Sequence, residues 1–417
     1  MRRIIKTINK MIALSGLDYR LIKKDNPRNI RKLLGKNKDQ FQKQLLTDGM
    51  NAVFFGYHDK TPFSQDNNRI LANSVAADDT KPESEGSLMK VGYFEKMENN
   101  KFKPEFINVS KTTTWSWQQG CMLQWNPLKP DREIIFNKMI NGKYGAVFMD
   151  IQSKKEVKHI SMPIYSVDPT GKYASSLNFS RLSRIRTGYG YKNIPDPTYQ
   201  FKAPEGDGLY LIDLESGKAE LIADLSELAE HTVMERDHYI NHVTFSPDGM
   251  HLAFFHFYGD DQIKRINRFY LYDIGNKKLR LLEAFRTVSH YCWRSPDEII
   301  TTENGPGGCL YYLYNINSKT KIRIDLPNIG DLHPMVHPVD TDMIVADSKP
   351  DRILNQHLFI FNLSTGSTSH IGTFHSPKEY RGPVRCDLHP RWDRKGEFVA
   401  VDVVNDGKRC LAVVKYS

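Results

Sequence analysis

A unit made of a turn and a β-strand recurs along the chain from about residue 50 onward, and this repetition restricts the fold more than any other feature. In each unit a polar turn precedes a run of β-forming residues, as in "FSPDGMHLAFFHF" from Phe245. Hairpin patterns such as "GLYLIDLESGKAELI" from Gly208 follow most units. Seven units begin at Pro62, Gln124, Tyr165, Phe245, Trp293, Val336 and Arg391.

Repeated sheets of about four strands cannot bury both faces alone, so they stack radially and close into a ring. Seven units therefore predict an all-β fold, a seven-bladed β-propeller, over residues 46–417. A β-sandwich or a stack of unrelated sheets explains the regular spacing less well. The chain ends with "CLAVVKYS", a single strand after the last unit. We therefore expect ring closure by an N-terminal strand around "NAVFFGY" (51–57), or by another non-sequential pairing.

Residues 1–45 are predicted to form a basic N-terminal helical extension. Within residues 1–24, apolar side chains recur at helical spacing between Lys and Arg residues, which is typical of a basic amphipathic helix. Such a helix could pack on the propeller or bind an anionic membrane reversibly. Because no signal-peptide cleavage site follows, we expect a cytoplasmic location, with peripheral contact at the inner membrane left open.

The composition indicates a soluble globular protein with an anionic partner. The 417 residues are 40% hydrophobic and carry a formal charge of +9. Nucleic acid, anionic lipid and acidic polysaccharide would all suit this charge, but no nucleic-acid-binding module is recognisable, so we expect no nucleic-acid partner. The five cysteines include no C-x-x-C pair, which argues against a disulfide framework and favours a reducing compartment.

Histidines stand at a similar offset before the turn in several units. They are His58, His242, His290, His333, His337 and His389. Because equivalent positions in a propeller surround one axis, we expect these imidazoles to converge. Asp387 and His389 lie two residues apart, so in an extended segment both would face the same side.

Imidazole nitrogens together with a carboxylate suit a divalent transition metal such as Mn or Zn. The candidate ligands are His290, His333, Asp387 and His389. An alternative is that each histidine only binds the backbone of a neighbouring blade. The sequence leaves both interpretations open.

The segments "NHVTFSPDGMHLAFFH", "VSHYCW" and "CDLHPRW", in this order, resemble the oligogalacturonate lyase family of propeller-type polysaccharide lyases. The resemblance covers most of residues 50–417. The stretches "TWSWQQGCMLQW" and "SSLNFSRLSRIRTGYGY" are also similar to segments of related propellers, including the ulvan lyase type.

The resemblance implies that His242 is the catalytic base and that His290, Asp387 and His389 bind metal. The chain departs from the family pattern in two ways: Asp387 replaces the first histidine of the family's pair, and the family's glutamine ligand falls near Val384. His333 is therefore a candidate replacement ligand.

A lyase of this kind cleaves a uronate chain by β-elimination. It removes the proton at C5 and expels the oxygen at C4, and a cation must neutralise the carboxylate. We expect His242 to be the base, Tyr189 or Tyr191 to be the acid, and Arg186 to bind the carboxylate. The candidate substrate-binding residues are His58, Trp117, Gln118, Arg181, Arg385 and Arg391.

These candidates also have purely structural explanations. Arginines often lie on solvated faces, and tryptophans in propellers often fill the space between blades. Two other functions also stay open: a transferase or hydrolase of surface-polysaccharide assembly, and a non-catalytic glycan-binding propeller. A hydrolase requires a pair of carboxylates. Asp59 and Asp387 are the only rim candidates for such a pair.

Overall fold

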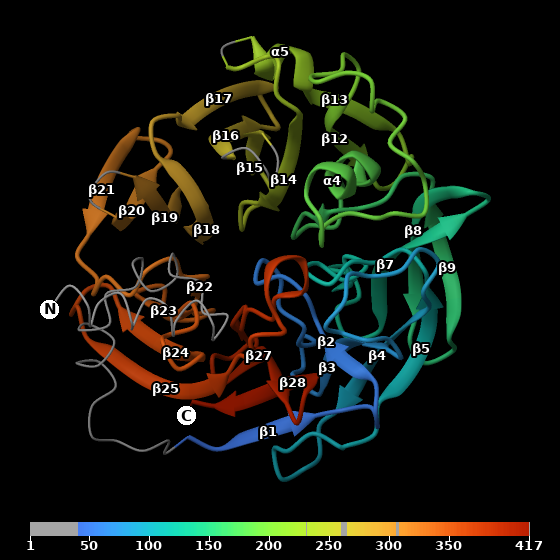
Figure 1. Cartoon of the computed structure of the whole chain (residues 1–417), viewed down its shortest axis with the longest axis vertical. Helices are drawn as coiled ribbons and strands as arrows, with labels where there is room; N and C mark the ends of the chain where they lie inside the picture. The colour runs from blue at the N-terminus through green and yellow to red at the C-terminus, as the bar shows by residue number, and fades with distance from the viewer. Residues whose placement is uncertain (1–40, 231, 260–264, 306–307, 417) are drawn as a thin grey trace, which may run out of the picture.

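Seven four-stranded antiparallel sheets surround a common axis in the computed structural model, which describes residues 41–230, 232–259, 265–305 and 308–416 (Figure 1). The predicted seven-bladed, all-β propeller is confirmed. The predicted helix over residues 1–24 and residues 25–40 of the extension lie outside the described residues.

The strands of each blade run from the axis outward. Blade one contains β2 (Ala52–Phe54), β3 (Arg69–Val75), β4 (Met89–Glu95) and β5 (Ile107–Thr112). Blade two contains β6 (Gln124–Trp125), β7 (Glu133–Ile140), β8 (Lys143–Asp150) and β9 (Lys155–Ile160). Blade three contains β10 (Ser166–Val167), β11 (Tyr173–Ser176), β12 (Gly208–Asp213) and β13 (Ala219–Asp224).

The remaining blades repeat this order. Blade four contains β14 (His238–Phe245), β15 (His251–Tyr258), β16 (Ile266–Asp273) and β17 (Lys278–Glu283). Blade five contains β18 (Thr287–Ser295), β19 (Glu298–Gly305), β20 (Gly308–Asn315) and β21 (Thr320–Ile324). Blade six contains β22 (Met335–Val336), β23 (Met343–Asp347), β24 (Asn355–Asn362) and β25 (Thr368–His375). Blade seven contains β26 (Arg391–Trp392), β27 (Phe398–Asn405), β28 (Lys408–Lys415) and β1 (Lys43–Leu46).

The recurrent turn has a local hydrogen-bond network that explains its sequence. Between β14 and β15, the Ser246 hydroxyl donates to the Asp248 carboxylate, and Gly249 adopts a φ of 74°. In blade one the Ser64 hydroxyl donates to Asp66 in the same way, and Asn67 takes the left-handed position with a φ of 59°. Glycine and asparagine are the residues that tolerate this conformation best.

Ring closure uses a strand other than the expected one. β1 pairs antiparallel with β28 and forms the outer edge of blade seven, whereas residues 52–54 form β2, the innermost strand of blade one (Figure 1). Of the two expected modes of closure, the one through residues 51–57 is wrong, and the alternative, another non-sequential pairing, is the one observed. The closing strand begins at Lys43, so the propeller includes residues of the segment 1–45.

In the described part of the chain, short helices interrupt the strand pattern at three places. α4 (Phe179–Ile185) follows β11, is capped by Asn178, and lies between β12 and the centre of the ring (Figure 1). α5 (Leu225–Ala229) is capped by Asp224 at the outer side of the ring. The 3₁₀ helix η1 (Gly382–Val384) precedes the segment that carries Asp387.

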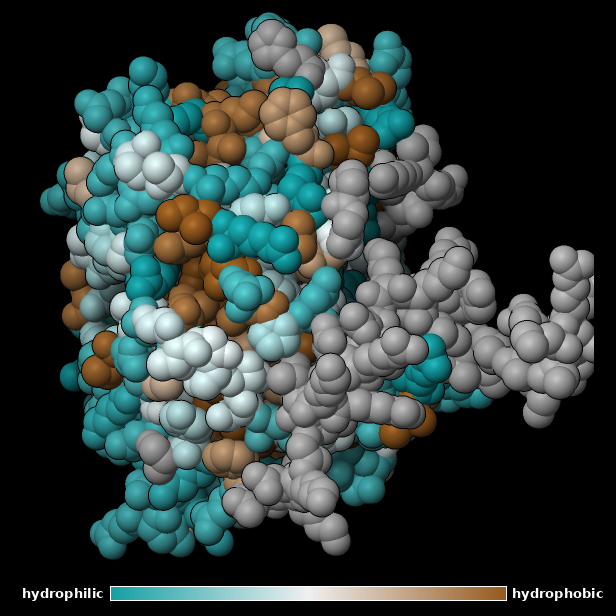
Figure 2. Space-filling model, turned by 90° about the vertical axis from the view of Figure 1, so that its left-hand side faces the viewer, coloured by the Kyte–Doolittle hydropathy of each residue, from teal (hydrophilic) through white to brown (hydrophobic). Residues whose placement is uncertain are grey.

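The side of the ring that carries β21 mixes small hydrophobic groups with hydrophilic residues (Figure 2). Ile322 of β21, with 62% of its surface exposed, is one of the exposed apolar residues of the molecule. In the described ranges, no helix has the length and apolarity needed to cross a membrane. All five cysteines are free thiols, as the sequence predicts.

Candidate active site

Histidines from four successive parts of the ring meet near its axis. The ring centroids of His290 and His333 lie 4.0 Å apart, and those of His333 and His389 lie 4.5 Å apart. His58 is 5.3 Å from His333 by the same measure. The structure therefore brings these four imidazoles together, as the repeat predicts. The expectation is wrong for His337, whose ring packs on Trp392 and whose Nε2 lies 3.3 Å from the carbonyl oxygen of Gly396.

All four of these histidines have a partner at Nδ1, which leaves Nε2 free to act as a ligand. Nδ1 of His58 lies 3.2 Å from the carbonyl oxygen of Pro334. Nδ1 of His290 lies 3.0 Å from an oxygen of Asp331, and Nδ1 of His333 lies 2.8 Å from Asp347. His389 Nδ1 lies 2.8 Å from the carbonyl oxygen of Gly56, to which it can only donate. Metal-ligating histidines have such partners, which fix the tautomer and the orientation of the ring.

His333, Asp387 and His389 form a buried group whose ligand atoms all lie within 4.8 Å of one another. Nε2 of His389 is buried, has no hydrogen-bond partner, and is 4.0 Å from an Asp387 oxygen. An unpartnered buried nitrogen beside a carboxylate fits a bound divalent cation. His290, the fourth ligand expected from the sequence, is not part of this group, although its ring adjoins that of His333.

Two site histidines have left-handed backbones. The φ angles are 55° at His242, beside a β-bulge between β14 and β15, and 44° at His389. The backbone of His242 is held on both sides: its N–H donates to the Tyr165 hydroxyl, and its carbonyl oxygen accepts from the Tyr291 hydroxyl. Conformations of this kind are costly for non-glycine residues and concentrate at functional sites.

Burial and charge fix the protonation states of the group. Burial lowers the pKa of His333 and His389 well below the usual range, so both imidazoles are neutral and able to bind metal. Burial opposes ionisation of Asp387, but the charges of Lys349 and Arg385 outweigh it and lower the pKa of this carboxyl. Burial, with Asp387 nearby, raises the pKa of Asp347 to about 7.

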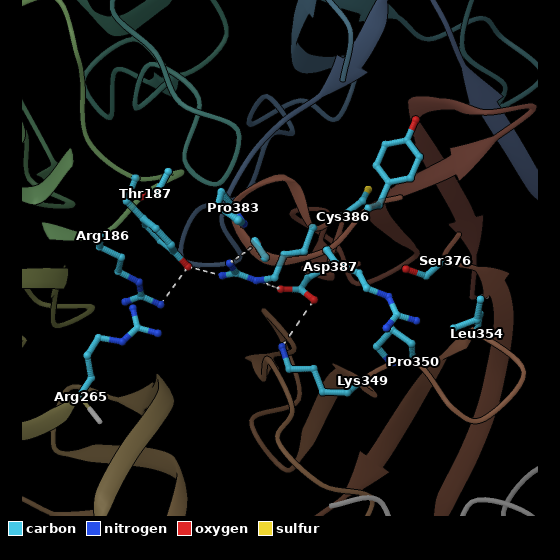
Figure 3. A pocket seen from close by; sticks show the side chains of 15 residues that line it. Arg186, Thr187, Arg265, Lys349, Pro350, Leu354, Ser376, Pro383, Cys386 and Asp387 are labelled. Atoms are coloured by element: carbon cyan, nitrogen blue, oxygen red, sulfur yellow. Dashed lines mark hydrogen bonds and ion pairs between the residues drawn. The ribbon is translucent and has the colours of Figure 1, made fainter. Parts of the chain in front are cut away.

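A pocket of about 750 Å³ lies beside Asp387 and is lined by five cationic side chains. These are Arg186, Arg265, Lys349, Arg381 and Arg385. In Figure 3 Arg186 and Arg265 enter from one side, while Lys349 faces Asp387. Among the described residues that line the pocket, Asp387 is the only carboxylate. The pocket therefore suits an anionic ligand of several charges.

Tyr189 lies between two of these arginines on the pocket wall. Arg186 Nη2 donates to its hydroxyl oxygen at 3.2 Å, and Arg385 Nη2 donates to the same oxygen. Arg385 also donates through Nε to Asp387 at 2.7 Å. On its other side, Arg186 Nη1 lies 3.3 Å from Nε2 of His242. One hydrogen-bonded chain thus joins His242, Arg186, Tyr189, Arg385 and Asp387.

Several predicted substrate-binding residues are buried supports instead. The Trp117 indole donates to the Lys81 carbonyl and packs between blades, so it is not available for stacking on a sugar. Arg181 is 1% exposed and is held by Asp196 and by the carbonyl of His238. Neither residue lines the pocket.

Gln118, Arg391 and Tyr191 are also held away from the pocket. The Gln118 amide donates to the carbonyls of Pro383 and Arg385, so it positions the segment that carries Arg385. The Arg391 guanidinium binds Asp402 in the core. The Tyr191 hydroxyl accepts from the Asn137 amide, and its ring stacks on Phe179, so of the two tyrosines only Tyr189 borders the pocket.

Sequence reasoning missed the carboxylates that hold the histidines and most of the pocket cations. Asp347 ends the buried strand β23, and Lys349 follows two residues later in "ADSKP". The carboxylate at the end of this apolar strand is the one sequence signal that could have indicated Asp347 as a site residue. Asp331, Arg265 and Arg381 lie in loops without a repeated pattern, so nothing in the sequence pairs them with the site.

Comparison with solved structures supports the propeller fold. No protein-family model and no curated protein matches the chain. The crystal structure of an oligogalacturonate lyase from Vibrio parahaemolyticus aligns with a TM-score of 0.61 and 13% identity, over 90% of this chain and 97% of the other. The chain has the oligogalacturonate lyase fold.

A second solved structure, an oligogalacturonate lyase in complex with manganese, aligns with a TM-score of 0.59 and 12% identity. The alignment covers 90% of this chain and 96% of that one. The resemblance to oligogalacturonate lyases that the sequence motifs suggested is therefore supported at the level of the fold.

Proposed function

We propose that the protein is a polysaccharide lyase that cleaves an acidic, uronate-containing glycan by β-elimination. The observation that carries this proposal is the pocket lined by five cationic side chains and a single carboxylate, Asp387, which also belongs to the buried histidine group. A polyanionic chain fits this charge, and the fold is one that oligogalacturonate lyases also have.

The arginine pair explains how a uronate would be held. Arg186 and Arg385 both reach the Tyr189 hydroxyl, so their guanidinium groups lie close enough to grip one carboxylate. Neutralising that carboxylate makes the adjoining C5 proton more acidic, because the charge that develops on its removal spreads onto the carboxylate. The pair would therefore bind the substrate and assist the same step.

His333, Asp387 and His389, with His290 beside them, would hold a divalent cation such as Mn²⁺ or Zn²⁺. A cation bound there would act as a Lewis acid toward the substrate carboxylate. The donor atoms fit, and one of the similar structures is a complex with manganese. Lys349 and Arg385 already contact Asp387 and keep it anionic.

The geometry disfavours a glycoside hydrolase, which needs one carboxylic acid and one carboxylate across the scissile bond. Asp387 is the only pocket carboxylate among the described residues, and its lowered pKa prevents it from donating a proton. Asp59 lies in a separate small cavity with His58 and His242, and not in the pocket wall.

The test is a panel of purified glycans incubated with the protein while the ultraviolet absorbance of the unsaturated uronate is followed. We expect turnover of at least one uronate-containing glycan and none of neutral glycans. Arg385→Gln should lower kcat/KM by roughly 10²-fold, since a charge-assisted contact to the carboxylate is lost. Lys395→Gln, a change in the turn between β26 and β27, is the matched control and should keep wild-type turnover. Absence of product with every uronate glycan would reject the proposal.

A further inference from the structure

We infer that Tyr189, as a phenolate, removes the C5 proton, and that His242 is a positioning residue that acts through Arg186. This inference rests on the proposed lyase function and changes the roles expected from the sequence, in which His242 is the base and Tyr189 an acid. Two observations support it: the hydrogen bonds of the two side chains, and the fact that Tyr189 borders the pocket whereas His242 does not.

The Tyr189 oxygen receives hydrogen bonds, and no described residue accepts its proton. Both of its partners in the described structure, Arg186 and Arg385, are guanidinium groups, which can only donate. A neutral phenol would leave its own proton without an acceptor, whereas a phenolate satisfies both donors. Arg265, on the same pocket wall, adds a third positive charge nearby. The surroundings thus stabilise the ionised form.

His242 is placed differently. Its side chain does not border the pocket and instead lines a small internal cavity with Tyr57 and His58. Its Nε2 already faces Arg186 Nη1 at 3.3 Å, and its Nδ1 is buried without a hydrogen-bond partner among the described residues. The Arg186 guanidinium lies over the Tyr189 ring, 4.0 Å from its centroid. His242 therefore holds Arg186 at the tyrosine, and its own ring meets the Tyr189 ring edge-on with centroids 6.0 Å apart.

The position of Tyr189 relative to a bound carboxylate completes the case. A carboxylate that bridges Arg186 and Arg385 must lie beside the Tyr189 oxygen, because both arginines contact that oxygen. The carbon that bears the carboxylate is C5, the carbon that loses its proton. The substrate group that the arginines hold thus brings the reacting C–H bond to the phenolate.

The proposed step is balanced in protons and electrons. The phenolate oxygen takes the C5 proton, the C–H electron pair forms the C4=C5 double bond, and the C4–O bond breaks with its pair on the departing oxygen. Water in the pocket protonates that oxygen, and Tyr189 later returns its proton to water. No oxidant or reductant is required.

The charges around Tyr189 give the step a pH dependence. Burial opposes ionisation of the phenol, but Arg186, Arg385 and Arg265 outweigh it, and the pKa of Tyr189 lies below its ordinary value; Asp387 acts in the opposite direction. Tyr57 and His242, which also face this tyrosine, are both buried, and burial favours the neutral form of each. Since the phenolate is the active form, turnover should rise with pH through the pKa of Tyr189 and be lost below it.

The experiment compares the wild type with Tyr189→Phe, His242→Gln and a control, Tyr311→Phe, whose buried hydroxyl binds the Gly330 carbonyl away from the pocket. We expect Tyr189→Phe to lower kcat by roughly 10²-fold or more with little change in KM, as loss of a general base does. His242→Gln should lower kcat by less than about tenfold, because its amide oxygen can still accept from Arg186. Tyr311→Phe should keep wild-type turnover.

Two readouts separate catalysis from structural support. Fluorotyrosine at position 189, which has a lower pKa than tyrosine, should move the acidic limb of the pH–rate profile to lower pH. The wild type should also show tyrosinate absorption that Tyr189→Phe lacks. If the wild type is active, an active Tyr189→Phe or an inactive His242→Gln would overturn the assignment of Tyr189 as the base. Either result would leave the proposed lyase function intact. Wild type that forms no unsaturated product would instead reject the proposed function, and the assignment with it.

Discussion

At the residue scale, the site depends on histidines whose Nδ1 atoms are occupied and whose Nε2 atoms are free. His389 shows this most clearly, since Gly56 fixes its tautomer and its other nitrogen has no partner. Sequence reasoning could select His290, His333, Asp387 and His389, because the repeat places them at equivalent offsets. It could not see that Asp331 and Asp347 orient two of them, because contacts between loops of different units leave no periodic signal.

Metal binding is the first prediction at this scale. The purified protein should hold roughly one transition-metal ion per chain. His389→Ala should lose this ion, because removing one ligand from a site of three or four lowers its affinity for the metal. Elemental analysis after dialysis against Mn²⁺ or Zn²⁺ provides the measurement. His159→Ala, a change on the exposed side of β9, is the matched control and should keep the metal. A wild type that binds no metal under these conditions would leave the arginines alone to neutralise the substrate.

At the scale of elements, the repeat predicts the number of blades and a non-sequential closure, but not which N-terminal strand closes the ring. The stretch 51–57 and the stretch 43–46 are both short and partly apolar, so local pattern does not distinguish them. The structure selects β1 because Leu46 fills a fully buried position beside β28, while Phe54 fills the core of blade one. Closure is thus decided by packing between distant segments, which one sequence does not display.

The closing strand predicts a difference in stability between two adjacent leucines. Leu46 is fully buried, whereas Leu45 is 39% exposed on the same strand. Leu46→Ala should lower the free energy of unfolding by about 2–5 kcal/mol, the usual cost of truncating a core leucine. Leu45→Ala should cost no more than about 1 kcal/mol. Denaturant unfolding followed by tryptophan fluorescence measures both, and equal losses would mean that β1 does not close the ring in solution.

At the scale of the whole molecule, the formal charge of +9 and the cationic pocket point to the same class of ligand. Composition alone left nucleic acid, lipid and acidic glycan open. The pocket favours an acidic glycan among these ligands, because five cationic side chains line one concave volume of about 750 Å³. A concave site of this size suits a few sugar units better than a membrane surface.

Salt dependence tests this electrostatic account. Since exposed charges are screened over a Debye length of about 8 Å at physiological ionic strength, affinity for an acidic oligosaccharide should weaken as salt is added. Titration calorimetry at several NaCl concentrations gives the measurement, with a neutral oligosaccharide of equal length as the control. An affinity independent of salt would contradict a role for the pocket cations in binding.

The central claim, elimination of a uronate, is tested most directly by the mass of the product. Elimination forms a C4=C5 double bond at the new non-reducing end, so that fragment is lighter by one water molecule than the fragment that hydrolysis gives. We expect mass spectrometry of a digested uronate oligosaccharide to show the lighter fragment, and digestion in H₂¹⁸O to leave ¹⁸O out of both new ends. Fragments of the hydrolytic mass, with ¹⁸O incorporated, would contradict the account.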